Sequence, residues 1–355
     1  RITIMQDIYS EIVKALSKKE KCALATLINR VGSAPRAVGA KYLIKEGGAS
    51  LGSIGGGCVE AEVWQEAQEV IEKHEGRVLH FDLTSEQLAE GGLVCGVNID
   101  IFLEPLREDF LEIYREAMSV RAGGGSAILA TPALVDGNFP KGQGLKVLMK
   151  SAGEKVGSLL GGADLEKKVL SEGKEALREK KPRILVSSYE GKKVEILLEP
   201  VFCEPTVYIF GGGHVSEQIV PLAKNVSFKV VVIDDREMFA NRERFPAADE
   251  VIVSEFENCF ERLSLDESSY VVIVTRGHLY DGIVLGQALE SKSRYIGMIG
   301  SRKKIGTLYQ SLIEKGISKE LLRRVHAPIG IDINSETPEE IAVSIVAELI
   351  KVRGE

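Results

Sequence analysis

The segment Leu51–Glu60, with the sequence LGSIGGGCVE, places a cysteine directly after three glycines and at the start of a predicted helix. Apolar residues continue at the spacing of one buried helical face, at Val59, Val63, Ala67, Val70 and Ile71. The N–H groups of Gly55, Gly56 and Gly57 lack partners within that helix and can face an anion, and the positive end of the helix dipole favours the thiolate of Cys58. The alternative is an ordinary glycine turn with a small buried thiol.

This segment belongs to the first copy of an internal repeat. Leu51–Cys58 aligns with Val156–Ala163, and Asn98–Pro105 aligns with Lys193–Pro200. The alternating strand pattern that ends at a proline in both copies predicts one α/β domain over residues 1–203, built from two strand–turn–helix–strand units.

The two copies differ at the residues that could carry chemistry. The second copy has Ala163 in place of Cys58 and Glu190 in place of Cys95, and it lacks the loop that ends at Arg36. We therefore expect the chemistry to lie in the first copy, at the thiols of Cys58 or Cys95 and at Arg36, which could bind an anion; drift in a degenerate copy is the alternative. Cys22, Cys203 and Cys259 lie near apolar patterns and are interpreted as packing residues.

Residues 206–355 alternate strands and helices in the order of a Rossmann-like doubly wound parallel sheet. The first strand leads into Gly211-Gly-Gly-His-Val-Ser216, a variant of the dinucleotide fingerprint. Gly211 and Gly213 would permit a tight turn and the approach of a phosphate, His214 begins the helix, and Asp234 ends the second strand, where it could bind a ribose. The alternative is a domain that kept this turn and lost its nucleotide.

A further loop at the carboxyl end of a predicted strand places Ser301 and Arg302 at a helix N-terminus. A cation there opposes the helix dipole unless an anion joins it, so this loop predicts a phosphate-binding position. The histidines and acidic residues show no paired spacing typical of a metal site, so we expect no metal site built from them.

Composition sets the broad class. The chain has 355 residues, 44% hydrophobic residues and a net charge of −7, which predicts two globular domains and argues against general nucleic-acid binding. The apolar runs are shorter than the roughly 20 residues that span a bilayer, and no secretory segment is recognised, so we expect no membrane partner. Five scattered cysteines without a C-x-x-C pair argue against a disulfide scaffold and favour the cytoplasm. A homodimer is expected only because symmetric dimers are common.

Motifs in both halves together resemble the XdhC/CoxI family of accessory factors for xanthine dehydrogenase and related molybdenum hydroxylases. They are Gly32-Ser-Ala-Pro-Arg36, Gly52–Glu60, Gly211–His214, Tyr295–Lys303, and Pro328–Asp332 followed by Thr337–Ala342. The resemblance covers almost the full chain. It implies an amino-terminal XdhC/CoxI domain followed by a Rossmann-like domain.

The family's role implies that the protein binds molybdenum cofactor, supports its sulfuration with a cysteine desulfurase and delivers it to an apo molybdenum hydroxylase. With that role, we expect Cys58 or Cys95 to contact molybdenum or to carry sulfur, and no other metal contact. A nucleotide such as NAD is a second candidate ligand of the Rossmann-like domain. Two departures from the family stand out: Val97 replaces a glycine after Cys95, and Arg276 replaces a histidine, adding a charge that an anionic cofactor would tolerate. The alternatives are an NAD(P)-dependent oxidoreductase that uses the carboxyl half and a non-catalytic assembly scaffold.

Overall fold

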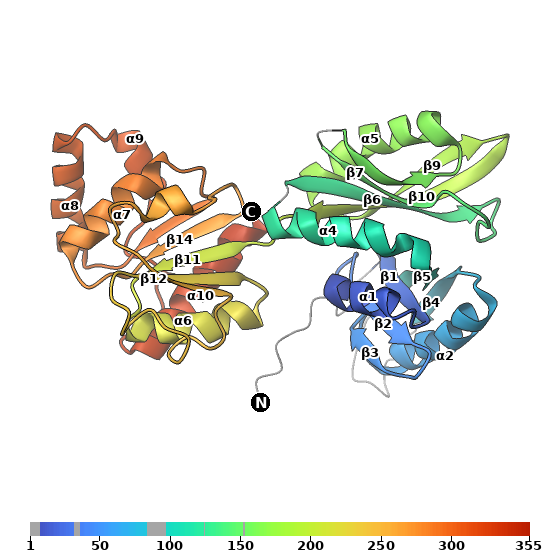
Figure 1. Cartoon of the computed structure of the whole chain (residues 1–355), viewed down its shortest axis with the longest axis horizontal. Helices are drawn as coiled ribbons and strands as arrows, with labels where there is room; N and C mark the ends of the chain where they lie inside the picture. The colour runs from blue at the N-terminus through green and yellow to red at the C-terminus, as the bar shows by residue number, and fades with distance from the viewer. Residues whose placement is uncertain (1–7, 32–35, 84–96, 124, 152) are drawn as a thin grey trace. The chain divides into compact units, whose positions relative to one another are not determined.

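A computed structural model describes residues 8–31, 36–83, 97–123, 125–151 and 153–355. Cys95 and residues 32–35 therefore lie outside the described part. The chain divides into two units, one over Gln6–Cys203 and the other containing Glu204–Glu355 (Figure 1). Each unit is described by itself.

The first unit contains two five-stranded antiparallel sheets with the same strand order. The orders are β3–β2–β1–β5–β4 and β8–β7–β6–β10–β9. The strands of the first sheet are β1 Cys22–Val31, β2 Lys41–Lys45, β3 Ser50–Gly52, β4 Arg77–Leu83 and β5 Val97–Leu106. Those of the second are β6 Ser126–Val135, β7 Leu145–Lys150, β8 Lys155–Leu159, β9 Arg183–Tyr189 and β10 Lys192–Phe202. The predicted α/β domain with an internal repeat is confirmed.

Helices form three layers around these two sheets. Helix α2, Gly57–Lys73, covers the outer face of the first sheet, and α5, Gly162–Glu179, covers that of the second. Helices α1, Ile8–Ser17, and α4, Leu111–Gly123, pack between the two inner faces (Figure 1). Neither α1 nor α4 was predicted from the sequence, and each precedes one copy of the repeat.

A buried polar network joins the two repeats. Lys146 on β7 has a fully buried side chain and donates hydrogen bonds to Thr131 and Glu104, both at 2.8 Å. At the matching position on β2, Lys41 donates to Thr26 at 3.2 Å and forms an ion pair with Glu199. Each lysine thus binds the threonine of its own repeat and the glutamate of the other.

The second unit contains a six-stranded parallel sheet of order β13–β12–β11–β14–β15–β16. Its strands are β11 Thr206–Phe210, β12 Lys229–Asp234, β13 Glu250–Val253, β14 Ser269–Ile273, β15 Tyr295–Met298 and the two-residue β16 Val325–His326. Its helices are α6 His214–Asn225, α7 His278–Glu290, α8 Arg302–Glu314, α9 Lys319–Leu322 and α10 Pro338–Gly354. The Rossmann-like fold is therefore confirmed, and β16 is a strand that was not predicted from the sequence.

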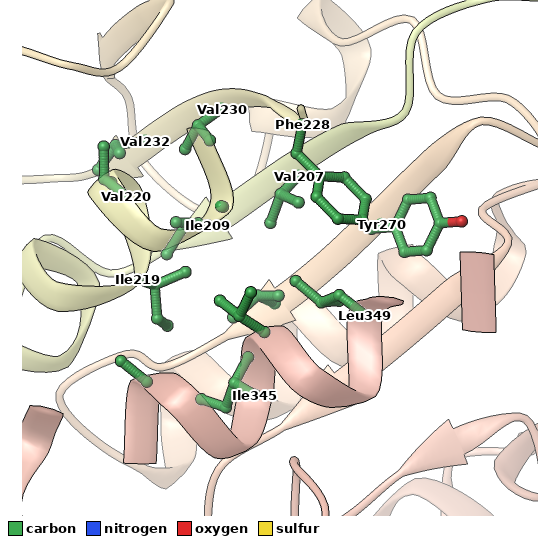
Figure 2. Packing of buried hydrophobic residues seen from close by; sticks show 14 of the residues in the cluster. Val207, Ile209, Ile219, Val220, Phe228, Val230, Val232, Tyr270, Ile345 and Leu349 are labelled. Atoms are coloured by element: carbon green, nitrogen blue, oxygen red, sulfur yellow. The ribbon is translucent and has the colours of Figure 1, made fainter. Parts of the chain in front are cut away.

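Every second residue of the central strands points to one face of this sheet, and that face is buried against α6 and α10. Figure 2 shows Val207, Ile209 and Val230 from the strands facing Ile219 of α6 and Ile345 of α10. Helix α10 begins with Thr337 as its N-cap and Glu340 closing a capping box, as the sequence predicted. Among the described residues, no helix is long and apolar enough to cross a membrane.

The buried network generates a stability prediction. Lys146→Met leaves Glu104 buried without its cationic partner, which typically costs about 3–5 kcal/mol of unfolding free energy. Urea unfolding followed by the fluorescence of Trp64, the single tryptophan, reports on this unit. The control Lys193→Met removes an exposed ion pair with Glu195 and should cost about 1 kcal/mol or less. Equal losses in the two variants would contradict a special role for the buried pair.

Candidate functional site

The turn before α2 presents Cys58 to solvent. Gly55, Gly56 and Gly57 have φ angles of 149°, 80° and 63°, a region that side chains disfavour. A Cβ at any of the three would meet no atom within 4 Å, so conformation rather than space requires glycine. Cys58 is the second residue of the helix and is exposed, which excludes the alternative of a buried thiol.

A carboxylate of the chain itself binds this turn. Glu60 Oε1 accepts hydrogen bonds from the hydroxyl of Ser53 at 2.7 Å and from the amides of Ile54, Gly55 and Gly56 at 3.0, 3.3 and 2.8 Å. Burial raises the pKa of Glu60, but these hydrogen bonds lower it more, so the net pKa is below its usual value. Glu60 is thus a built-in anion.

This contact corrects the expected use of the glycine amides. The N–H groups of Gly55 and Gly56 donate to Glu60, which leaves the neighbouring first turn of α2, and not these two amides, for an external anion. The N-cap Gly56 supplies no side-chain acceptor to that turn, which includes Gly57 and Cys58. The role of Glu60 was not predicted from the sequence. The repeat alignment could have drawn attention to it, because the second copy has the core residue Leu165 where the first copy has a carboxylate.

The remaining cysteines that the structure describes are less accessible than Cys58. Cys22 and Cys259 are each 2% exposed, and burial raises their thiol pKa values to about 12 and about 11. Cys203 is half-buried. Arg36 is exposed, and its carbonyl oxygen accepts a hydrogen bond from Arg30. In the described ranges no hydrogen bond or ion pair joins the Arg36 side chain to the Cys58 turn.

The second unit gathers the other expected site residues at the carboxyl ends of its parallel strands. The Gly211–Gly213 turn follows β11, which lies between β12 and β14. A Cβ at Gly211 would lie 2.4 Å from the carbonyl oxygen of Val274, whereas one at Gly213 would meet no atom within 4 Å. Gly213 is the N-cap of α6 and His214 its exposed first residue, so the open side of this turn faces outward.

Asp234 has a different role from the one expected. Its side chain is 2% exposed and accepts a hydrogen bond from the amide of Gly212 at 2.8 Å and from Arg236 Nε at 2.9 Å. Burial raises the pKa of this carboxyl, but the hydrogen bonds from Arg236 and Gly212 lower it below its usual value. Asp234 therefore fixes the glycine turn, and a ribose would have to compete with these internal donors.

The charge of Arg276 is also paired internally. Its two terminal nitrogens bind both carboxylate oxygens of Asp235, at 2.5 and 2.6 Å, and one of them donates to the Tyr280 hydroxyl at 2.8 Å. The positive charge that Arg276 adds is therefore already paired with a carboxylate of the chain itself.

The first turn of α8 contains three basic residues and no acidic one. Ser301 is the N-cap and accepts from the amide of Lys304, while Arg302, Lys303 and Lys304 are exposed. A positive cluster at the positive end of a helix dipole is unfavourable until an anion binds. Elsewhere, the described residues include no group of three or more His, Cys, Asp or Glu side chains placed to hold a metal ion.

Comparisons with known proteins match both units. A model of the XdhC and CoxI family matches residues 15–82, which include the Cys58 turn, and a model of the XdhC Rossmann domain matches residues 207–349. The chain is 31% identical over 221 residues to the uncharacterized protein YqeB of Escherichia coli, a match that covers 59% of this chain and 40% of YqeB.

Two other relatives match over nearly the whole chain. A Bacillus subtilis protein described as a probable subunit of xanthine dehydrogenase is 23% identical, with 98% of each chain covered. The molybdenum cofactor insertion chaperone PaoD of Escherichia coli is 22% identical, covering 96% of this chain and 86% of PaoD. A crystal structure described as a xanthine dehydrogenase from Bacillus halodurans has a TM-score of 0.78 at 25% identity, covering 97% of this chain and 95% of that chain.

The carboxylate on the glycine turn generates a second prediction. Glu60→Ala removes the acceptor of three amides, and hydrogen bonds to a charged group contribute about 1.5–3 kcal/mol each. Hydrogen exchange at Ile54, Gly55 and Gly56 should therefore accelerate roughly ten-fold or more. Glu60→Gln, which retains an acceptor oxygen, should lose less protection, and Glu62→Ala on the exposed side of α2 should lose none. Unchanged protection in Glu60→Ala would show that this contact does not hold the turn.

Proposed function

Because the chain belongs to the XdhC and CoxI family, we propose that it is an accessory protein that binds molybdenum cofactor and delivers it to an apo molybdenum hydroxylase. The names of its full-length relatives, a probable xanthine dehydrogenase subunit and a molybdenum cofactor insertion chaperone, support this role. In the same proposal the protein supports sulfuration of the cofactor with a cysteine desulfurase, and it works as a cytoplasmic homodimer.

The observation that carries the proposal is the exposed thiol of Cys58 on a glycine turn at a helix N-terminus. Thiolate is a soft, nucleophilic ligand suited to molybdenum and to carrying sulfur, and the uncapped first turn of α2 suits an anionic group beside it. Glu60 holds this turn in the first repeat, while the second repeat keeps the scaffold without the thiol or the carboxylate. Cys95 is the second candidate thiol of the proposal.

The third prediction concerns the cargo itself. Anaerobic incubation of the intact protein with cofactor released from a molybdoenzyme, followed by gel filtration, should give pterin and molybdenum that co-elute with the protein. The variant Cys58→Ala/Cys95→Ala should retain roughly ten-fold less cofactor, because it lacks both candidate soft ligands. The control Cys22→Ala/Cys259→Ala removes two buried thiols and should retain cofactor as the wild type does.

The same experiment separates the alternatives. If pterin and molybdenum never co-elute with the wild type, the proposal fails. Turnover of reduced nicotinamide by such a preparation would favour the oxidoreductase, and the absence of both properties would favour the scaffold. Equal cofactor retention by the two double variants would remove Cys58 and Cys95 from the site while leaving cofactor binding in place.

In the second unit, we propose that Gly211, Gly213, His214, Ser301 and Arg302 form an anion site for a nucleotide such as NAD, or for the phosphate end of the cofactor. The open face of Gly213 and the exposed cations at the start of α8 support this assignment.

The fourth prediction tests that anion site. Arg302→Ala removes a charge-assisted contact of about 1.5–3 kcal/mol, so the affinity for the bound nucleotide or cofactor should fall roughly ten-fold or more. Calorimetry with AMP, NAD and the cofactor measures the change. Lys319→Ala is a matched control, because Lys319 also follows a serine N-cap at the first position of a helix. An equal effect of the two substitutions would indicate nonspecific charge attraction instead of a site.

A further inference from the structure

The pair Asp235–Arg276 joins two strands that are not neighbours in the parallel sheet. Asp235 directly follows β12, and Arg276 lies in the loop between β14 and α7. Both β12 and β14 pair with β11, one on each side, so the ion pair connects the two flanking strands past the carboxyl end of β11. The Gly211–Gly213 turn begins at that end.

Several contacts hold this pair in one geometry. The guanidinium binds both oxygens of Asp235 in a bidentate arrangement, which is the most directional form of an arginine–carboxylate contact. Its Cζ lies 4.3 Å from the centre of the Tyr280 ring, whose hydroxyl it also binds. The Asp235 side chain is 8% exposed and has Arg236 as a second, looser neighbour at 3.6 Å, while the Arg276 side chain is 35% exposed.

The location matters because of how Rossmann-like sheets bind dinucleotides. The pyrophosphate lies at the N-terminus of the first helix, and the two nucleoside halves extend to opposite sides of the first strand along the carboxyl edge. In this unit those two sides are the ends of β12 and β14, which the Asp235–Arg276 pair connects. A phosphate or a mononucleotide needs only the N-terminus of α6 and one side of the edge.

We propose that the Asp235–Arg276 pair is a latch across the nucleotide crevice, which admits a phosphate or mononucleotide and disfavours a dinucleotide while it is closed. This inference rests on the proposed function in one respect, namely that the second unit binds a nucleotide or phosphate group. Opening requires Arg276 to leave Asp235, after which both sides of β11 are accessible. In this proposal Arg276 and Asp235 limit the size of the bound nucleotide and do not themselves bind it.

Calorimetry on the intact protein with AMP and NAD tests the latch. We expect the wild type to bind NAD at least ten-fold more weakly than AMP. Asp235→Asn and Arg276→Ala should each raise the affinity for NAD roughly ten-fold and change that for AMP less than about two-fold. The control Arg107→Ala breaks a bidentate pair with Asp109 beside an aromatic ring in the first unit, and it should change neither affinity.

Each other outcome overturns the latch. If Arg276→Ala weakens NAD binding while Asp235→Asn strengthens it, Arg276 is a ligand of the phosphate. If neither substitution changes NAD affinity, the pair does not obstruct the crevice. If no protein binds AMP or NAD, the crevice has no nucleotide for a latch to select. Because molybdenum cofactor retention is measured separately by gel filtration, the accessory function can stand or fail independently of these results.

Discussion

Two lysines that exchange glutamate partners, Lys146 fully buried and Lys41 partly buried, determine how the first unit is built. Lys146 reaches Glu104 in the other repeat, and Lys41 reaches Glu199 in the reverse direction. Burial alone would lower the pKa of Lys41, but the carboxylate of Glu199 raises it overall, so the lysine remains charged inside the unit. A buried charge without its partner is strongly unfavourable, so neither repeat is satisfied alone. The exchange therefore ties each repeat to the other through a charged partner.

The strands that carry these lysines, β2 and β7, each pair with a short strand that contains a glycine and leads toward a helix. Gly52 on β3 has a φ angle of 92°, and a Cβ there would lie 2.3 Å from the carbonyl oxygen of Lys41. Gly157 on β8 has a φ angle of 88°, and a Cβ there would lie 2.4 Å from the carbonyl oxygen of Lys146. Both repeats thus bring a short third strand against the lysine strand and enter a helix a few residues later. Only the first repeat completes this entry with Cys58 and Glu60, so the scaffold occurs twice and the proposed thiol site once.

Sequence patterns predicted the elements better than the contacts between their polar groups. The repeat was visible because Glu104-Pro105 and Glu199-Pro200 end similar strands, and the parallel sheet was visible because its strands are continuous apolar runs. A pattern of residue types does not say which donor satisfies which acceptor. For that reason the pairing of Arg276 and the internal use of Asp234 could be found only in the structure, whereas the repeat alignment could have singled out Glu60 without naming the amides that it binds. Lys41 and Lys146 were missed because lysine in a strand ordinarily indicates the solvent face.

In both candidate sites, a carboxylate of the chain itself accepts hydrogen bonds from the amides of a glycine-rich turn. A glycine-rich turn exposes several amide donors, and unpaired buried donors are costly in the absence of ligand. Glu60 satisfies the amides of Gly55 and Gly56, and Asp234 satisfies that of Gly212. Each carboxylate fixes the turn from the inside and leaves the next residues, Cys58 in one unit and Gly213 in the other, on the open side. Because a carboxylate already pairs these inner amides, each turn is ordered before a ligand arrives. A ligand then binds the outer groups of the turn without the cost of ordering them. Such preorganisation suits the proposed role, in which the protein binds a cargo and releases it again, since the turn need not rearrange in either step.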